Sequence, residues 1–450
     1  MTKAIADQPP THLGIQQGGR PSYRASGILA AAVLITLVVL DTLSPPGPPL
    51  TTLIGIIVYA AKTAIGMLIV AFGLWALLTT RLPLVFRLAT LFYALIVISW
   101  FITWIVFRTS GGGALNDSAL TYLLNPTFSV WSWLMILMVP LVARLNNNGQ
   151  LTNAIGHIPL SLGMIMMLIP ALGIGLLGLN LNASNAAVAM LFIIACRPTI
   201  TVYSRAKRLI LSLIVCAAMI IAGYRIYAVG AILFVINSFL PKSRWFLIFE
   251  LIAISFIPVM FQYVLANYSD VIYAHSTTSF TDTRSFLFKE LTDDLSANEM
   301  LIGRGIDARY YSQYFFNIAK YNSSAVGYNN IWRTSSEIAW LNIILHYGVL
   351  ALAPFYIAVI VPAFAKSRRL TENIPLEGIY SFLPVMMLLF AGELWNAISA
   401  SYFCWYAALG AMLTARPSIA SYVSSPPSMR QAASQRENNE LWSKNQVTSP

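Results

Sequence analysis

Long apolar runs recur along almost the whole chain, from Ser26 to Ala415. Each run is close to the roughly 20 residues that an α-helix needs to cross the hydrocarbon core of a bilayer. Only 10% of the 450 residues are charged, whereas soluble domains average about 25%. Because backbone polar groups inside lipid must pair within the chain, runs of this length predict an all-α polytopic membrane protein.

Hydropathy predicts about twelve spans, with one large polar loop between the ninth and the tenth. The stretches 208–240 and 377–415 could each form one bent element, but the charge pattern favours two spans in each. Polar residues 1–26 and 416–450 are expected to be disordered cytoplasmic tails. The expected spans are 27–43, 53–79, 83–107, 127–143, 157–178, 184–196, 208–222, 225–240 and 245–266, then, after the polar segment 267–334, 335–365, 377–392 and 395–415.

Basic residues concentrate in the even-numbered connections between these spans. Cytoplasmic loops of membrane proteins carry an excess of Lys and Arg, so both termini are predicted to be cytoplasmic and the polar segment to face outward. The net charge of +11 is thereby explained by topology, and nucleic-acid binding is not expected. The basic residues concerned are Arg81, Arg87, Arg144, Arg197, Arg205, Lys207, Arg208, Lys242, Arg244, Lys366, Arg368 and Arg369.

A few charged residues lie inside or at the ends of spans. Lys62 lies within the second span, and an ion pair with Asp41 of the first span is the expected arrangement, because charges inside membranes usually pair. Arg225 lies between two spans, where it could extend to the interface or have a functional role. His346, about eleven residues into its span, is expected to be a hydrogen-bonded packing residue. Neither the cysteines nor the acidic residues show metal-ligand spacing, so no metal or other cofactor is expected.

The polar segment 267–334 is nearly neutral, with six Lys or Arg and seven Asp or Glu. Apolar residues at helical spacing predict an amphipathic helix over 283–295. Arg284 falls on its apolar face near the N-terminus. There it could bind an anion beside free backbone amides, or pair with one of the nearby aspartates.

Further along, Gly303-Arg304-Gly305 predicts a tight turn. The tyrosines that follow, beginning with Tyr310, could belong to an interfacial aromatic belt or stack on sugar rings. Ser336 and Glu337 open the next span, where Glu337 could cap the helix or accept a proton.

These residues together resemble the O-antigen ligase and Wzy-type polymerase family of integral membrane, GT-C-like glycosyltransferases. The resemblance rests on Arg284, Leu301–Gly305 and the pattern Ser336-Glu337-x3-Leu341-x6-Gly348, with Arg225 similar to an earlier arginine of the family. The topology fits over about 390 residues. Ligases of the family often have a His-Asn pair where this chain has Ser336-Glu337, which favours a polymerase.

The resemblance implies transfer of glycan from an undecaprenyl-diphosphate-linked donor to a similar acceptor, with inversion and without a metal, in the bacterial inner membrane. Arginines would balance the charge of the leaving diphosphate. It implies catalytic roles for Glu337, Arg284 and Arg225. Substrate contacts are expected from Arg304, Arg309, Arg333, Gly303, Gly305, Tyr310, Ser336 and Glu393.

Membrane lipid, a chain-length regulator and a flippase are the further partners that this function implies. A ligase, a protein O-oligosaccharyltransferase, and a flippase or secondary transporter stay as alternatives. Transporters tend to contain inverted repeats, and no internal repeat is evident in this chain.

Overall fold

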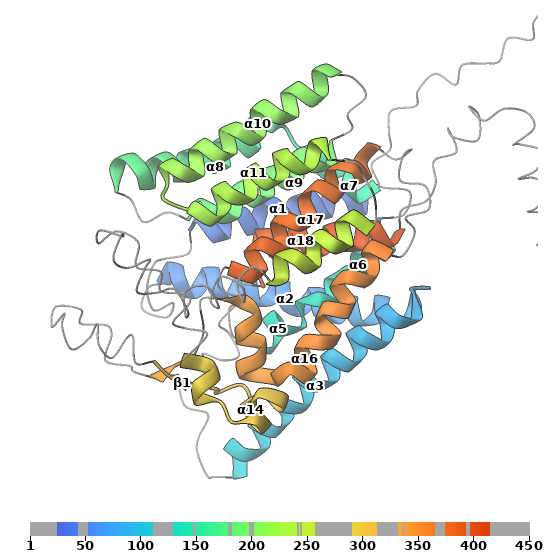
Figure 1. Cartoon of the computed structure of the whole chain (residues 1–450), viewed down its shortest axis with the longest axis vertical. Coiled ribbons are helices and arrows are strands. Elements are labelled where there is room, and N and C mark those ends of the chain that lie inside the picture. Colours follow the sequence, from blue (N-terminus) through green and yellow to red (C-terminus); the bar gives the residue numbers. More distant parts are fainter. Residues whose placement is uncertain are drawn as a thin grey trace, which may run out of the picture.

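The computed structural model describes residues 25–43, 53–110, 129–146, 150–178, 182–197, 202–240, 243, 245–256, 290–312, 332–334, 336, 338–364, 374–392 and 397–414. Each of the twelve predicted spans overlaps a helix or a run of short helices (Figure 1), although residues 257–266 of the ninth span lie outside the described residues. In chain order the elements are α1 (Ala25–Thr42), α2 (Leu53–Thr79), α3 (Leu84–Ser110), α5 (Val130–Trp133), η1 (Leu134–Leu137), α6 (Met138–Leu145), α7 (Gln150–Gly156), α8 (Leu160–Leu177), α9 (Ser184–Cys196), α10 (Val202–Ile221), α11 (Arg225–Phe239), the unlabelled helix Trp245–Phe256, α14 (Ala297–Ile302), β1 (Tyr310–Tyr311), β2 (Trp332–Arg333), α16 (Ala339–Phe364), α17 (Ile374–Gly392) and α18 (Ala400–Thr414).

Among the described residues, five helices are long and apolar enough to cross a membrane alone: α1, α2, α3, α8 and α16. The bent pair formed by Val130–Leu145 and α7 would make a sixth if it counts as one span. The other apolar helices, such as α9 and α18, are shorter. The chain is therefore a helical membrane protein, and the figure of twelve crossings stays a prediction.

The core of the helical body is built around α9, which lies among α8, α17 and α18 (Figure 1). All 13 of its residues are buried, as expected for a helix that is apolar on every face. A Cβ at Gly378 would overlap the carbonyl of Ala195, so α17 packs closely against α9. In contrast, α3 exposes large apolar side chains such as Phe92 and Phe107, which suits a lipid-facing surface.

Contacts between the connections support the predicted division into two faces. The Arg144 guanidinium lies 3.6 Å from the centre of the Trp75 ring, which joins the fourth connection to the end of α2. Arg197 donates to the Ile158 carbonyl at 2.6 Å, which joins the sixth connection to the fourth. These even-numbered connections therefore contact one another or the C-terminal end of α2, which leads into the second connection. The polar segment instead contacts α3 near its C-terminal end. Which face is cytoplasmic stays a prediction.

The predicted ion pair between Lys62 and Asp41 is confirmed. Lys62 Nζ lies 2.6 Å from Asp41 Oδ1, and both side chains are almost completely buried, with 3% and 1% exposed. The other carboxylate oxygen of Asp41 accepts the backbone N–H of Ala400 at 2.8 Å. Asp41 thereby joins α1 and α2 to the first turn of α18, where a negative charge also suits the helix dipole.

Candidate functional site

The described part of the polar segment begins with a short helical stretch, residues 290–294, which belongs to the predicted helix over 283–295. Leu291 and Leu295 are buried there. α14 follows and starts with a capping box, in which the Ser296 side chain accepts the amide of Glu299 and the Glu299 carboxylate accepts the amide of Ser296. This reciprocal pair of hydrogen bonds fixes where the helix begins. It also holds the Glu299 carboxylate beside Arg304 of the Gly303–Gly305 turn.

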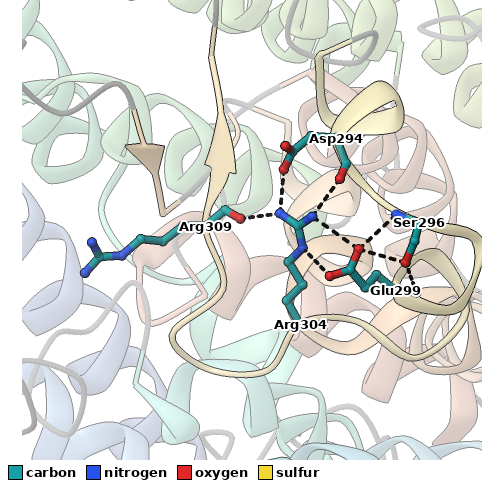
Figure 2. A network of polar contacts seen from close by, with 5 residues as sticks. All are labelled: Asp294, Ser296, Glu299, Arg304 and Arg309. Carbon is teal, nitrogen blue, oxygen red and sulfur yellow. Dashed lines mark hydrogen bonds and ion pairs between the residues drawn. The ribbon is translucent and has the colours of Figure 1, made fainter.

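Arg304 is the centre of an ion-pair network between these elements (Figure 2). Its Nε and one Nη donate to Glu299, at 2.9 and 3.2 Å. Its other donors bond the Asp294 carboxylate, the Asp294 carbonyl and the Arg309 carbonyl. These five bonds match the five N–H groups of a guanidinium. Arg304 would have to release one of them to bind a substrate, so in this conformation it holds the segment together.

The network also changes the acidity of the Glu299 carboxylate. The hydrogen bond from Arg304, followed by those from the backbone and hydroxyl of Ser296, lowers the pKa of Glu299 to about 2. Glu299 is thus ionised at neutral pH and stays paired. Its side chain is 36% exposed, so solvent weakens the interaction.

The Gly303–Gly305 turn docks directly on a break in α16. Gly348 has φ 73° and ψ 179° inside this helix, and Gly303 has nearly the same angles, 80° and 177°. A Cβ at Gly303 would overlap the His346 carbonyl, and one at Gly348 would overlap the Leu301 carbonyl. Only glycine adopts this backbone region without strain and leaves room for the contact. We call this contact between Gly303, Gly305 and Gly348 the glycine junction.

Hydrogen bonds reinforce the glycine junction. The amide of Arg304 donates to the Leu345 carbonyl at 2.8 Å, and that of Gly305 donates to the His346 carbonyl at 2.9 Å. Both acceptors lie in the last turn before the break. The turn therefore uses backbone carbonyls that a continuous helix would pair internally.

His346 is buried, and each of its ring nitrogens faces a backbone carbonyl, one of which accepts the single N–H of the neutral ring, as the prediction of a packing residue implied. Nδ1 lies 2.8 Å from the Gly305 carbonyl, and Nε2 lies 3.2 Å from the Thr334 carbonyl. The ring also packs against Trp133, with centroids 5.2 Å apart. His346 therefore joins the glycine turn and the residue after β2 to the helical body.

Two tryptophans of α3 complete the attachment. Trp100 Nε1 donates to the Ile302 carbonyl at 3.0 Å, and Trp104 Nε1 donates to the Asp307 carboxylate at 2.7 Å. Figure 1 shows α14 beside the C-terminal part of α3. The polar segment is thus held on α3 and α16 together.

A two-stranded antiparallel ribbon closes the described segment, with Tyr310 opposite Arg333 and Tyr311 opposite Trp332. Alternation along the strand places Tyr310 in the core, with no exposed surface. The Tyr311 and Trp332 rings contact each other, 5.7 Å apart, at the accessible side. Of the two adjacent tyrosines, Tyr311 is therefore the more accessible, and a substrate contact by Tyr310 stays a prediction.

Ser336 is also buried, and it lies three residues before the first residue of α16. Its amide donates to the Asn342 side chain at 2.6 Å, its carbonyl accepts from that side chain at 2.8 Å, and its hydroxyl accepts the Ile338 amide at 3.3 Å. These bonds fix the chain just before Ala339, the first residue of α16. They give Ser336 a structural role, and its contact with substrate stays a prediction.

The remaining described arginines are placed differently. The Arg309 side chain is exposed and points away from the network (Figure 2). Arg333 is half-buried on the ribbon, and Arg225 is exposed at the first residue of α11. Among the residues that the structure describes, no carboxylate forms a salt bridge with Arg309. Among the cations that the structure describes in the segment, Arg309 is thus well placed to meet an anion from solution.

Three predicted site residues, Arg284, Glu337 and Glu393, lie outside the described residues. Gly303, Gly305 and Arg304 hold the polar segment in place, whereas Tyr310 and Ser336 are buried. The sequence interpretation overlooked Trp100 and Asn342, which have no local signal. It also overlooked the capping pattern Ser296-x-x-Glu299, which was available. In the described parts of the chain, no three His, Cys, Asp or Glu side chains gather as metal ligands would.

Comparison with known proteins adds no relative: no protein-family model matches the chain, and no curated protein matches it.

Proposed function

We propose that this protein is a glycosyltransferase that polymerises undecaprenyl-diphosphate-linked oligosaccharide repeat units at the periplasmic face of a bacterial inner membrane. A hydroxyl of the acceptor attacks the anomeric carbon of the donor sugar. The bond from that carbon to the diphosphate oxygen breaks, and lipid diphosphate leaves with the electron pair. Glu337 accepts the hydroxyl proton, and the reaction inverts the anomeric configuration without a metal.

The observation that carries this proposal is the glycine junction. The resemblance rests on two short motifs, Leu301–Gly305 and the pattern ending in Gly348, and these touch through the glycine junction. Contact between the two motifs is the arrangement expected if both contribute to one functional unit. The fixed turn also holds Arg309 exposed at the end of α3 where the polar segment docks.

In this mechanism the cations act on the leaving group. A diphosphate leaves readily once its negative charge is balanced, and fixed guanidinium groups supply that balance without rearranging. Arg309 and Arg333 come from the docked ribbon and Arg225 from the start of α11, with Arg284 as the expected fourth. The Arg304 network keeps the turn that carries Arg309 from moving away.

The test is polymerisation in proteoliposomes that contain purified protein and lipid-linked repeat units. Wild type should produce a ladder of longer glycans. Arg309→Ala should slow chain growth roughly 10- to 100-fold, the effect of losing one charge-assisted hydrogen bond of about 1.5–3 kcal/mol, and Arg309→Lys should retain part of the rate. Arg225→Ala and Arg284→Ala should abolish growth. The matched control is Lys207→Ala, an exposed cation on α10, which should leave the ladder unchanged.

Three other outcomes would redirect the assignment. No ladder from wild type, under conditions in which a known polymerase makes one, would reject polymerisation. Transfer of finished glycan to lipid A core or to a protein, identified by mass spectrometry, would indicate a ligase or an O-oligosaccharyltransferase. Movement of the lipid-linked glycan across the vesicle membrane without covalent change would indicate a flippase.

A further inference from the structure

Unpaired polar groups gather in one region of the helical body, where α3, α16 and α18 meet. The Tyr93, Tyr347 and Tyr406 hydroxyls have no hydrogen-bond partner among the described residues, nor do the Thr90 hydroxyl and the Trp405 indole N–H. All five side chains are fully buried. Buried polar groups in folded proteins nearly always have a partner, so the concentration of exceptions in one place needs an explanation.

The five groups lie close to one another. Tyr93 of α3 packs on Phe355 of α16 with ring centroids 5.4 Å apart, and Phe355 packs on Trp405 of α18 at 6.0 Å. Trp405 stacks on Tyr406 at 5.6 Å. The hydroxyls of Tyr347 and Tyr406 are both near enough to that of Tyr93 for electrostatic interaction. The hydroxyls of three tyrosines from three helices therefore lie near one another, with the Trp405 ring stacked on Tyr406 and Thr90 one helical turn before Tyr93 on α3.

This region is deep within the spans. The apolar span of α3 runs from Leu84 to Phe107. Tyr93 is the tenth of its 24 residues, which places it about 4 Å from the middle of the span at about 1.5 Å per residue. Neither bulk water nor lipid headgroups reach this depth, and hydrocarbon offers no hydrogen-bond acceptor. A partner for these hydroxyls has to be enclosed within the protein.

We propose that the contact region of Thr90, Tyr93, Tyr347, Trp405 and Tyr406 is a binding site for an internal cluster of water molecules. Tyrosine and threonine hydroxyls can both donate and accept, and the indole N–H donates, so a few waters satisfy all five groups. Enclosed waters of this kind typically make about three hydrogen bonds each to otherwise unsatisfied groups. This site is separate from the proposed transferase chemistry and does not depend on it.

The first test is radiolytic hydroxyl-radical footprinting of the wild-type protein in lipid nanodiscs, read by mass spectrometry. Radicals form from water, so buried side chains that touch bound water are oxidised although bulk solvent does not reach them. Tyr93, Tyr347 and Tyr406 should be modified at least several-fold faster than Phe192 and Phe382, an equally buried aromatic pair with ring centroids 5.0 Å apart. Equal rates for the tyrosines and this pair would overturn the proposal.

The second test uses the sign of a stability change. A hydroxyl that bonds water loses that bond in Tyr93→Phe, Tyr347→Phe or Tyr406→Phe, so the Tm should fall by about 1–3 °C in each variant. A hydroxyl buried in a dry site is relieved of an unpaired group by the same substitution. A Tm that is unchanged or raised at all three positions would therefore refute the water cluster. Footprinting of wild type decides the matter if any variant fails to fold.

Discussion

Gly303→Ala should detach the polar segment from α16 while leaving the helical body folded. The substitution adds a Cβ where the His346 carbonyl and the Tyr347 amide nitrogen already lie, and neither backbone atom can rotate away. It also places a non-glycine residue at φ 80° and ψ 177°. The attachment, rather than the global fold, is expected to fail, because the turn is a local contact on the surface of α16.

The magnitude has two parts. Backbone strain in this region costs about 1–3 kcal/mol, and overpacking against atoms that cannot move costs about 1–3 kcal/mol. The sum is about 2–6 kcal/mol. Even the lower bound corresponds to a roughly 30-fold change in the ratio of docked to undocked segment.

Hydrogen–deuterium exchange in nanodiscs measures this ratio, because the amides of Arg304 and Gly305 donate across the glycine junction. Peptides covering these two residues should exchange at least 30-fold faster in Gly303→Ala, with no change in peptides from α9. Gly223→Ala is the matched control, since Gly223 has the same φ of 80° but open space around it. If Gly303→Ala leaves exchange at Arg304 within threefold of wild type, the docking argument is wrong.

Two more perturbations follow from the ion pairs. Asp41→Asn leaves Lys62 buried without its counter-charge, which should cost about 3–5 kcal/mol of stability and reduce the folded yield in size-exclusion chromatography. The double variant Asp41→Leu, Lys62→Met should recover part of that yield. A wild-type Tm for Asp41→Asn would contradict the predicted loss of stability. The pKa of Glu299 is lowered from 4.5 to about 2 mainly by Arg304, so its stabilising effect is complete above pH 4.5 and is lost as the pH falls towards 2. After allowance for solvent screening the effect is about 1 kcal/mol, and the Tm difference between wild type and Glu299→Gln should be present at pH 5 and close near pH 2; a difference that persists at pH 2 would argue against the pairing.

The positions of the helices could be predicted because hydropathy responds to burial in lipid. The span predicted over 53–79 is α2, and that over 184–196 is α9. The prediction for α10 began at 208, but the helix begins at Val202. Its first turns contain Arg205 and Lys207, and a hydropathy window ends at such charges although a helix can continue beyond the apolar region.

The glycine junction could be predicted only in part. The sequence indicated a turn at Gly303 and Gly305, because two glycines around one residue favour close backbone approach. It gave no sign that α16 breaks at Gly348, since hydropathy treats 335–365 as one span and its prolines lie further along. A contact between residues about forty positions apart depends on the tertiary arrangement, which no local pattern records.

The acids that pair with Arg304 are close to it in sequence, but the sequence does not show whether this arginine pairs with them or binds an anion. Asp294 and Glu299 were near in sequence, yet an arginine between two glycines equally fits an anion site. The structure shows the guanidinium fully used by these two acids and two carbonyls. The capping pattern at Ser296 could have predicted the orientation of Glu299 and hence the pairing.

The break in α16 has a consequence for biogenesis. The Gly303–Gly305 turn is synthesised before α16, yet its amides bond carbonyls that belong to α16. In a continuous helix, the Leu345 and His346 carbonyls would pair with the amides of residues 349 and 350. The polar segment therefore has to wait until a later helix has inserted and can bend at Gly348. Insertion of α16 and closure of the segment become one late step, and a chain stopped before Gly348 would leave the segment undocked.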